Sequence, residues 1–394
     1  MKKIIVLGVN AYLKKTIEKL KAAGYYVIVT DKNPEADGSE LANEFYSIDI
    51  MDQEETLGLS RNKNIDGIIA LNEFGSGTAA YVADKMNLNG YKISTIEATK
   101  DKGLMRDCWF KAGLNIPGYT VIQTLDQAVK AAKQIGYPCI LKPADSGGSG
   151  RGVSIINSPD DVRWAYEFAR PYASKDRFII EAFIDGTELT IESFTINNKT
   201  TFLAISDKVK PDLRTRVATS INYPANLPQT ILHQVKNQVE EALEALQLDN
   251  GIAHTEIIVN KEGKPFLIET AARGGGGHIF HTIIEVVSGV NVPVLQAKWL
   301  LKEPLEIGEI THKGCCYRFF DPPRGILKEV HQIELAKKIP GVLDIGITRK
   351  PGEAVGGMEN SLQRSGFIVT TGKNREDAIA IADQAEDMVK FIVE

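Results

Sequence analysis

Two apolar, β-branched segments joined by a short turn constrain this chain more than any other feature. Residues 254–260 and 265–271 flank a polar turn that carries Glu262-Gly263, a pattern typical of a β-hairpin. A turn centred between residues 262 and 263 would place Glu256 directly opposite Glu269 on one face of the hairpin. Opposed side chains on neighbouring strands have Cβ atoms roughly 5 Å apart, and like charges at that spacing destabilise the pair. The hairpin therefore predicts that these two carboxylates share a positive partner.

A hard divalent cation is the simplest such partner, because carboxylate oxygens are ligands that Mg²⁺ and Mn²⁺ prefer. Arg273 follows the second segment and leads into four glycines that end at His278. Glycines let a ligand approach the backbone closely. The alternative interpretation is an exposed hairpin with solvated charges, and the local sequence leaves both interpretations open.

Length and composition narrow the class of protein. A chain of 394 residues exceeds one ordinary core, so two or three α/β units are expected. A net charge of −5 gives no basic footprint for nucleic acid. No stretch approaches the roughly 20 apolar residues of a membrane span, so we expect no membrane partner either. Four cysteines without zinc spacing or a disulfide framework fit a reducing compartment, and we expect a cytoplasmic protein.

The N-terminal residues predict a βαβ unit over residues 2–30. Asp31 follows its second strand and could hold the ribose of a nicotinamide cofactor, but the first turn lacks the glycine fingerprint of such sites. A further strand at 67–71 ends just before Glu73. Ligands of open α/β sheets bind at the carboxyl ends of strands, so Glu73 is a candidate for binding a substrate amine. Alternatively, Glu73 caps the helix that follows.

A strand, a lysine and a glycine-rich segment predict a phosphate site. Lys142 lies in a strand at 139–143, and the glycine-rich residues 144–153 follow it. Backbone N–H groups of such a loop collect around an anion, and the lysine adds positive charge. Another apolar strand follows, so the loop would form a hairpin flap, with a flexible linker as the alternative. Upstream, one helix over residues 99–111 would contain Lys102.

The remaining segments predict further loops, helices and strands. Residues 206–216 are basic and predict an irregular loop over an anionic ligand, or else a solvated surface. Trp164 and Phe168 are expected in the core. A helix at 278–288 would point its N-terminus toward the metal and phosphate region. Beyond about Leu305 we expect strands within 314–320, 341–347 and 365–371, and a closing helix at 375–389.

In the order and spacing of these segments, the chain resembles the ATP-grasp ligases over nearly its full length. The resemblance implies an α/β fold with a pre-ATP-grasp, Rossmann-like domain at residues 1–95. An ATP-grasp domain would follow at 96–305, with a flap-bearing lid subdomain at about 115–185. A small C-terminal α+β unit at 306–394 would complete the catalytic half. The resemblance also implies ATP and Mg²⁺ (or Mn²⁺) as cofactors.

The family's motifs carry over onto individual residues of this chain. By the resemblance, Glu256 and Glu269 would bind the metal, and Arg273 would act in catalysis with Lys142. The ATP-binding residues would be Lys102 and Lys142 at the phosphates, the closing loop Ser146, Gly147, Gly148, Ser149, Gly150 and Gly152, then Glu181, Ala182 and Ile184 around adenine, and Glu188 at the ribose. The substrate would contact Glu73, Arg273, Gly276 and His278.

One departure from the family concerns the metal. Many ATP-grasp ligases carry an asparagine two residues after the second metal-binding glutamate, where this chain has Ala271. The expected register places Ala271 opposite His254. Metal coordination is then left to two glutamates, phosphate oxygens and water, unless a nearby side chain substitutes.

The glycine run at 273–278 and the tail of the chain look most like the L-amino acid ligases and the phosphoribosylglycinamide-synthetase-like group. This resemblance implies an ATP-dependent carboxylate–amine ligase. Such an enzyme activates a carboxylate as an acyl phosphate and joins it to an amine, releasing ADP and phosphate. We expect small-molecule carboxylate and amine substrates, a dipeptide-like product and a possible homodimer.

Two other functions stay open. A purine-pathway enzyme would bind a phosphorylated sugar amine and would need a further basic pocket. Arg318, Arg324 and Arg364 could supply that pocket, or could equally hold a substrate carboxylate. The second alternative is a nucleotide-binding regulatory module without turnover, which the alanine at position 271 would suit.

Overall fold

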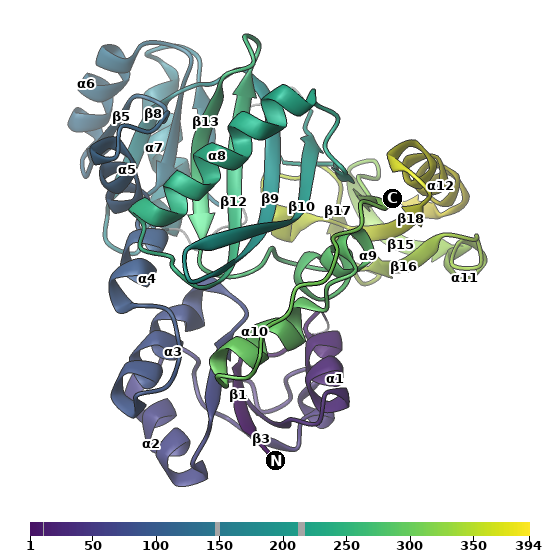
Figure 1. Cartoon of the computed structure of the whole chain (residues 1–394). Helices are drawn as coiled ribbons and strands as arrows, with labels where there is room; N and C mark the ends of the chain where they lie inside the picture. Colours follow the sequence, from purple (N-terminus) through teal and green to yellow (C-terminus); the bar gives the residue numbers. More distant parts are fainter. Residues whose placement is uncertain (11, 146–149, 212–216) are drawn as a thin grey trace.

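The fold is known from a computed structural model, which describes residues 1–10, 12–145, 150–211 and 217–394. It is a mixed α/β architecture with four sheets (Figure 1). Within the described residues no single helix is long and apolar enough to cross a membrane. The two helical segments Ile279–Ser288 and Val292–Leu300 reach that length and apolar composition only when they are taken together. They are bent by 109° relative to each other.

The N-terminal sheet is parallel and has the strand order β3-β2-β1-β4. Strands β1, β2 and β4 are mostly buried apolar runs because both faces of the sheet are covered there, as is usual for parallel sheets. Ile4 and Val6 of β1 pack toward the large central sheet, whereas Ile5 and Leu7 pack on the opposite side. The elements are β1 (Lys3–Leu7), α1 (Lys14–Ala22), β2 (Tyr26–Thr30), η1 (Ser39–Leu41), β3 (Glu44–Tyr46), α2 (Gln53–Lys63), β4 (Gly67–Ala70) and α3 (Glu73–Met86).

The connection to the next sheet corrects one expectation. We expected a single helix over residues 99–111, but the chain forms α4 (Ile93–Lys100) and α5 (Lys102–Lys111). Asp101 separates them in an extended conformation, and its side chain accepts a hydrogen bond from the Leu104 N–H at 3.0 Å. Because Asp101 caps the second helix, Lys102 lies at the first position of α5.

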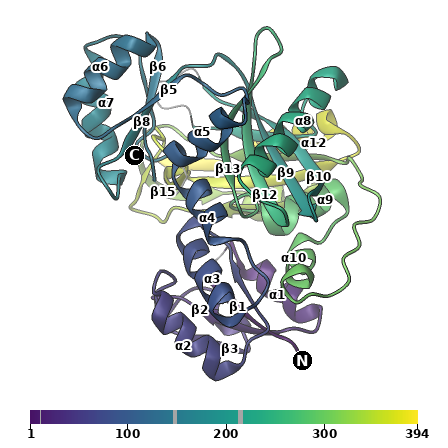
Figure 2. The same ribbon diagram turned by 60° about the vertical axis from the view of Figure 1, so that its left-hand side comes forward.

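The second sheet is antiparallel, with the order β5-β8-β6-β7. In Figure 2 it stands beside the central sheet, covered by α6 and α7. Strands β6 and β7 pair, so the hairpin expected around the glycine-rich segment is confirmed, although residues 146–149 lie outside the described part. The elements are β5 (Tyr119–Ile122), α6 (Leu125–Ile135), β6 (Cys139–Pro143), β7 (Ser154–Ile156), α7 (Asp161–Ala169), η2 (Arg170–Tyr172) and β8 (Phe178–Ala182).

The expectation that Trp164 lies in the core is wrong. Its side chain is exposed on α7 and stacks on Phe168, with ring centroids 5.2 Å apart. The buried positions of this helix are instead the small or branched residues Val162, Ala165 and Ala169, which face the sheet.

The central sheet has eight strands in the order β13-β12-β9-β10-β11-β14-β18-β16. The last three come from the C-terminal part of the chain, so segments far apart in the sequence share one sheet (Figure 1). The elements are β9 (Gly186–Ile196), β10 (Lys199–Val209), β11 (Ser220–Tyr223), α8 (Gln229–Ala245), β12 (Gly251–Asn260), β13 (Pro265–Ala271), β14 (Gly314–Phe319), β16 (Val342–Ile347) and β18 (Gly366–Gly372).

Strand β10 corrects the expectation for residues 206–216. Its ladder with β9 and β11 extends to Val209, so residues 206–209 are strand and not irregular loop. Residues 212–216 of that segment lie outside the described part of the chain.

The remaining elements pack around the central sheet. The helix expected at 278–288 begins as a π-helix, η3 (Ile279–Ile283), and continues as α9 (Ile284–Ser288), followed by α10 (Val292–Leu300) beside the N-terminal domain. The three expected C-terminal strands and the closing helix are confirmed. The sequence analysis did not predict a small sheet, ordered β17-β15-β19, or two short helical segments. These elements are β15 (Gly325–His331), α11 (Ile333–Ala336), β17 (Ala354–Val355), η4 (Ser361–Gln363), α12 (Arg375–Met388) and β19 (Lys390–Val393).

Candidate active site

Most of the expected site residues that the structure describes surround one cavity of about 980 Å³. Its walls come from the β12–β13 hairpin, from β9 and β10, from strands β6 and β8 of the second sheet (the β6–β8 sheet), and from the C-terminal strands. The predicted residues that line it are Glu73, Lys102, Lys142, Gly150, Glu181, Ala182, Ile184, Glu188, Glu256, Glu269, Arg273 and Gly276.

The hairpin register confirms the predicted pair: Glu256 lies opposite Glu269. The turn itself differs from the expectation, because the Gly263 N–H donates to the Asn260 carbonyl at 2.9 Å and Val259 pairs with Pro265. A bulge between the pairs Ile257–Leu267 and Glu256–Glu269 adds one residue, Ile268, to β13 and restores the register at the glutamates. The Ile268 carbonyl accepts a hydrogen bond from Arg106 Nη2 at 2.6 Å.

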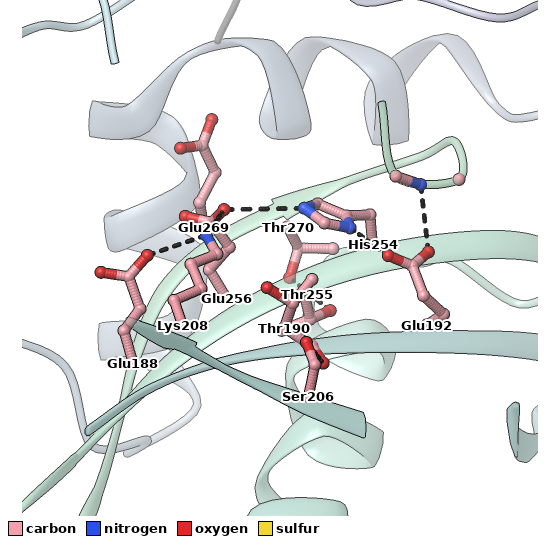
Figure 3. A network of polar contacts seen from close by, with 12 residues as sticks. Glu188, Thr190, Glu192, Ser206, Lys208, His254, Thr255, Glu256, Glu269 and Thr270 are labelled. Carbon is pink, nitrogen blue, oxygen red and sulfur yellow. Dashed lines mark hydrogen bonds and ion pairs between the residues drawn. The ribbon is translucent and has the colours of Figure 1, made fainter. Parts of the chain in front are cut away.

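Lysine side chains hold both glutamates. Lys102 Nζ lies 3.0 Å from Glu269 Oε1, and Lys208 Nζ lies 2.5 Å from Glu256 Oε1. Figure 3 shows Lys208 between Glu256 and Glu188 on one face of the sheet. Although burial raises the pKa of Glu256, Lys208 and His254 outweigh it and hold that pKa well below its ordinary value. Glu256 is therefore charged, and each of the two glutamates has a lysine partner.

Glu188, expected at a ribose, is paired with two lysines. Lys208 Nζ is 2.8 Å from Glu188 Oε1, and Lys210 contacts the other oxygen. Both lysines come from the segment expected to cover an anionic ligand, and both line the cavity. Arg214 and Arg216 of the same segment lie outside the described residues.

Glu181, expected at adenine, is almost fully buried and holds two cations. Arg106 Nε lies 2.6 Å from Glu181 Oε1, and Lys142 contacts Oε2. Burial lowers the pKa of Lys142 below its ordinary value, against the opposing charge of Glu181. The Ala182 N–H already donates to the Gly118 carbonyl at 2.8 Å. Arg106 was missed as a site residue, because nothing in the sequence of α5 shows which of its faces meets β8.

Arg273 is paired with Glu73. Arg273 Nη2 lies 2.5 Å from Glu73 Oε1, so two residues 200 positions apart meet at the cavity wall. Glu73 is the first residue of α3, and Asn72 caps that helix by accepting from the Gly75 N–H at 3.0 Å. Burial raises the pKa of Glu73, but Arg273 and Lys102 outweigh it and hold the pKa below its ordinary value.

A second group of residues that the sequence analysis missed stands beside the glutamates. Glu192 is fully buried; it accepts from the Gly275 N–H at 3.0 Å, and its Oε1 lies 2.5 Å from His254 Nδ1. The other ring nitrogen, His254 Nε2, is 3.6 Å from Glu256 (Figure 3). Although burial lowers the pKa of His254, the two glutamates raise it to about 9. The alternation Glu188, Thr190, Glu192 along β9 is the sequence signal that could have identified this face.

The close contact of Glu192 with Gly275 explains one glycine of the run. A Cβ at position 275 would lie 2.6 Å from Glu192 Oε1, whereas one at Gly276 meets nothing within 4 Å. His278 is buried in an aromatic group and does not line the cavity; its ring lies 4.3 Å from that of Phe367. Burial lowers the pKa of His278 to about 4, so the ring is neutral.

Two glycines of the predicted phosphate loop lie within the described residues. Gly150 lines the cavity, and Gly152 has a positive φ of 68° beside Pro143. Ser146, Gly147, Gly148 and Ser149 lie outside the described residues.

The donor set suits a hard cation that shares its ligands with a nucleotide. Within the described residues no three side chains of His, Cys, Asp or Glu converge in a metal-binding arrangement. Glu256 and Glu269 supply two carboxylates, and Ala271, which pairs with His254 as expected, supplies no ligand. Two carboxylates completed by phosphate oxygens and water fit the coordination of Mg²⁺.

Two family models match parts of this chain. A family model described as an ATP-grasp domain matches residues 135–282, and one described as the L-amino acid ligase C-terminal domain 2 matches residues 318–394. The chain is 30% identical over 203 residues to a formate-dependent phosphoribosylglycinamide formyltransferase of Bacteroides thetaiotaomicron. That match covers 50% of this chain and 52% of the relative, about half the length of each.

Two solved structures share the whole fold. An L-amino acid ligase from Bacillus licheniformis superposes with a TM-score of 0.86 at 23% identity, covering 100% of this chain and 99% of the other. A phosphoribosylglycinamide synthetase from Anaerococcus prevotii superposes with a TM-score of 0.77 at 21% identity, covering 100% of both chains.

Proposed function

Because the chain belongs to the ATP-grasp superfamily of ADP-forming carboxylate–amine ligases, whose members use ATP with Mg²⁺, we propose that it joins two amino acids in a dipeptide-like amide bond. The observation that carries this proposal is the convergence of Glu256, Glu269, Lys102 and Arg273 on one cavity. The match of residues 318–394 to an L-amino acid ligase domain supports amino acids as substrates.

The reaction needs activation because direct attack of an amine on a carboxylate would have to expel oxide. A carboxylate oxygen of the donor attacks the γ-phosphorus of ATP, the bond from that phosphorus to the β,γ-bridging oxygen breaks, and ADP leaves. The acceptor amine then attacks the acyl carbon, phosphate leaves with the bonding electrons, and the nitrogen loses a proton. Such chemistry requires positioning and charge neutralisation, and no nucleophilic side chain.

Each charged residue of the cavity then has a role. Glu256 and Glu269 would hold Mg²⁺, which neutralises phosphate charge when bound. Lys102 and Lys142 would bind phosphate oxygens, and Arg273 would stabilise the charge on the transferred phosphoryl group. The β6–β7 hairpin would exclude water, which would otherwise hydrolyse the acyl phosphate.

The test is ADP release with ATP, Mg²⁺ and pairs drawn from the twenty amino acids. We expect turnover with at least one pair and an amide product by mass spectrometry. Glu269→Gln should abolish turnover, because the neutral amide removes a metal ligand and its charge. Glu262→Gln, in the turn of the same hairpin, is the matched control and should keep full activity. No ADP release with any pair would contradict the proposal.

A purine-type reaction is the second candidate, since the formyltransferase and synthetase relatives carry phosphoribosyl substrates in their names. ADP release with a phosphoribosyl amine, and none with amino acids, would decide for it. A cytoplasmic location and a homodimer complete the proposal. The four cysteines are all free thiols, which supports a cytoplasmic location.

A further inference from the structure

Arg318, Arg324 and Arg364 of the C-terminal unit were candidates for binding a substrate anion. The structure gives each of them different surroundings. Arg318 is neutralised by Glu386 at 2.5 Å and Asp383 at 2.8 Å. Arg324 lies against Gly357 and does not line the cavity. Arg364 does line the cavity, and among the described residues no carboxylate forms an ion pair with it.

Arg364 is held in place without being neutralised. Its guanidinium carbon lies 3.2 Å from the ring centroid of Phe319, and Nη2 donates to the Ala218 carbonyl at 3.1 Å. Its Nε is buried and has no hydrogen-bond partner. Burial lowers the pKa of Arg364 to about 10, although Tyr317 opposes the shift. A largely desolvated cation without an anion is costly, so this position suits a ligand anion.

The surroundings of Arg364 are apolar and aromatic. Tyr317, Phe319 and Phe367 line the cavity beside it, with Tyr317 and Phe319 ring centroids 4.4 Å apart. Tyr12 closes the group from the N-terminal domain, 5.9 Å from Phe367. One further arginine, Arg349, is near but does not line the cavity, and its Nη2 donates to the Leu362 carbonyl at 2.9 Å.

Among the described residues of this aromatic part of the cavity wall, Arg364 supplies one guanidinium, which fits a carboxylate next to an apolar side chain better than a phosphate. Phosphate sites gather several charges or a row of backbone N–H groups. In a ligase of two amino acids, the donor's carboxylate is consumed by phosphorylation, whereas the acceptor keeps its own. The acceptor is therefore the substrate that needs a cation away from Arg273.

We infer that Arg364 binds the free carboxylate of the amine substrate and that Tyr317, Phe319 and Phe367 contact its side chain, so the acceptor is an apolar α-amino acid. This inference rests on the proposed amino acid ligase activity and adds the class of one substrate. It assigns Arg364 to substrate binding and leaves phosphoryl transfer to the residues around the hairpin.

The experiment compares acids with their amides. L-Phenylalanine and L-leucine, and L-phenylalaninamide and L-leucinamide, serve as acceptors with each of the twenty amino acids as donor. The wild-type protein should favour the free acid in kcat/KM. Arg364→Gln should reduce that preference by roughly 10-fold or more through KM for the acid, since a charge-assisted bidentate contact is lost. Reaction with the amide should stay nearly unchanged.

Matched variants keep the result interpretable. Arg318→Gln removes an arginine of the same C-terminal unit that is already neutralised, and it should leave the acid-to-amide ratio unchanged. Arg364→Lys should restore part of the preference because it keeps the charge. An unchanged ratio in Arg364→Gln, or equal losses with acid and amide, overturns the assignment.

Binding separates this inference from the proposed function. If the wild-type protein releases no ADP with any pair, the proposed function fails, and equilibrium dialysis with labelled L-phenylalanine still tests Arg364. With Mg²⁺ and a non-hydrolysable ATP analogue present, L-phenylalanine should bind to wild type and not to Arg364→Gln. Equal binding to both proteins, or competition by ribose 5-phosphate but not by L-leucine, contradicts an amino acid carboxylate at this site.

Discussion

Buried charges around the cavity are arranged in pairs and triplets whose members come from different elements. Glu181 on β8 joins Arg106 of α5 to Lys142 of β6, and all three side chains are nearly inaccessible to solvent. A buried ion pair adds little net stability over an apolar replacement of the whole set, but loss of one member leaves an uncompensated charge. The triplet thus fixes Lys142 in position at the cavity wall.

Replacement of Arg106 tests this arrangement. Arg106→Met should lower the free energy of unfolding by about 3–5 kcal/mol, because Glu181 keeps only one of its two cations in a desolvated position. The measurement is denaturant unfolding together with thermal melting. Arg170→Met is the control: Arg170 is exposed, lies 3.8 Å from Glu167, and should contribute no more than about 1 kcal/mol. Equal stability of the two variants would show that Glu181 is compensated by Lys142 alone.

The glutamates of the hairpin were predictable from sequence, and two buried charged residues near them, Arg106 and Glu192, were not. Strand alternation identified Glu256 and Glu269 as candidates, but their direct opposition also depends on the bulge at Ile268, which the local pattern did not predict. Arg106 and Glu192 belong to elements whose facing is set only when distant strands pair, as β9 does with β12. The roles of all these residues in ATP, metal or substrate binding remain predictions.

Single residues at element boundaries position the charged side chains. Sequence periodicity predicted one continuous helix over 99–111, because it does not detect a cap inside a helical pattern. Asp101 interrupts that pattern, caps α5 and pairs with Arg177. The Lys102 N–H then donates to the Ala144 carbonyl at 2.9 Å, which ties the helix start to the end of β6. The bulge at Ile268 acts similarly, since it sets the register at Glu269 independently of the turn.

Removal of the cap should therefore change nucleotide affinity as well as stability. Asp101→Ala should cost about 0.5–2 kcal/mol of stability, as for other N-caps, and should raise KM for ATP several-fold by loosening Lys102. Asn374→Ala is the matched control, because Asn374 caps α12 by accepting from the Asp377 N–H at 2.9 Å, away from the cavity. It should lose similar stability without a change in KM. An unchanged KM for ATP in Asp101→Ala would show that the cap does not affect the function of Lys102 at the site.

At the scale of the whole molecule, the cavity gathers charge from all parts of the fold. Glu73 belongs to the N-terminal domain, Lys142 to the β6–β8 sheet, Glu256 to the central sheet, and Arg364 to the C-terminal unit. Composition and pattern predicted that these units exist, and the comparisons confirm the fold. How the units meet depends on packing between elements such as α1 and α10, which no local pattern encodes. The domain boundaries expected from sequence therefore remain predictions.

Metal and nucleotide binding should be strongly coupled across this cavity. Lys102 and Lys208 neutralise Glu269 and Glu256, so a bare divalent cation would have to displace two ammonium groups. Under the proposed function, nucleotide phosphates would give those lysines another partner and would leave the carboxylates to the metal. The rise in Tm with Mg²⁺ and a non-hydrolysable ATP analogue together should exceed the sum of their separate effects. A ligand at 100 times its Kd adds about 2.7 kcal/mol to the folded state, which is readily detected by thermal melting.

A lysine variant makes this coupling testable in both directions. Lys102→Met removes the ammonium group that competes for Glu269, so Mg²⁺ alone should raise its Tm more than it raises that of the wild type. The same variant would also lose the phosphate contact proposed for Lys102, so the additional effect of the nucleotide should shrink. Lys100→Met, two residues earlier and exposed at the end of α4, should behave as the wild type does. If Mg²⁺ alone stabilises the wild-type protein as much as Mg²⁺ with the analogue, the lysines do not compete with the cation, and the charge pairing around the hairpin has only a structural role.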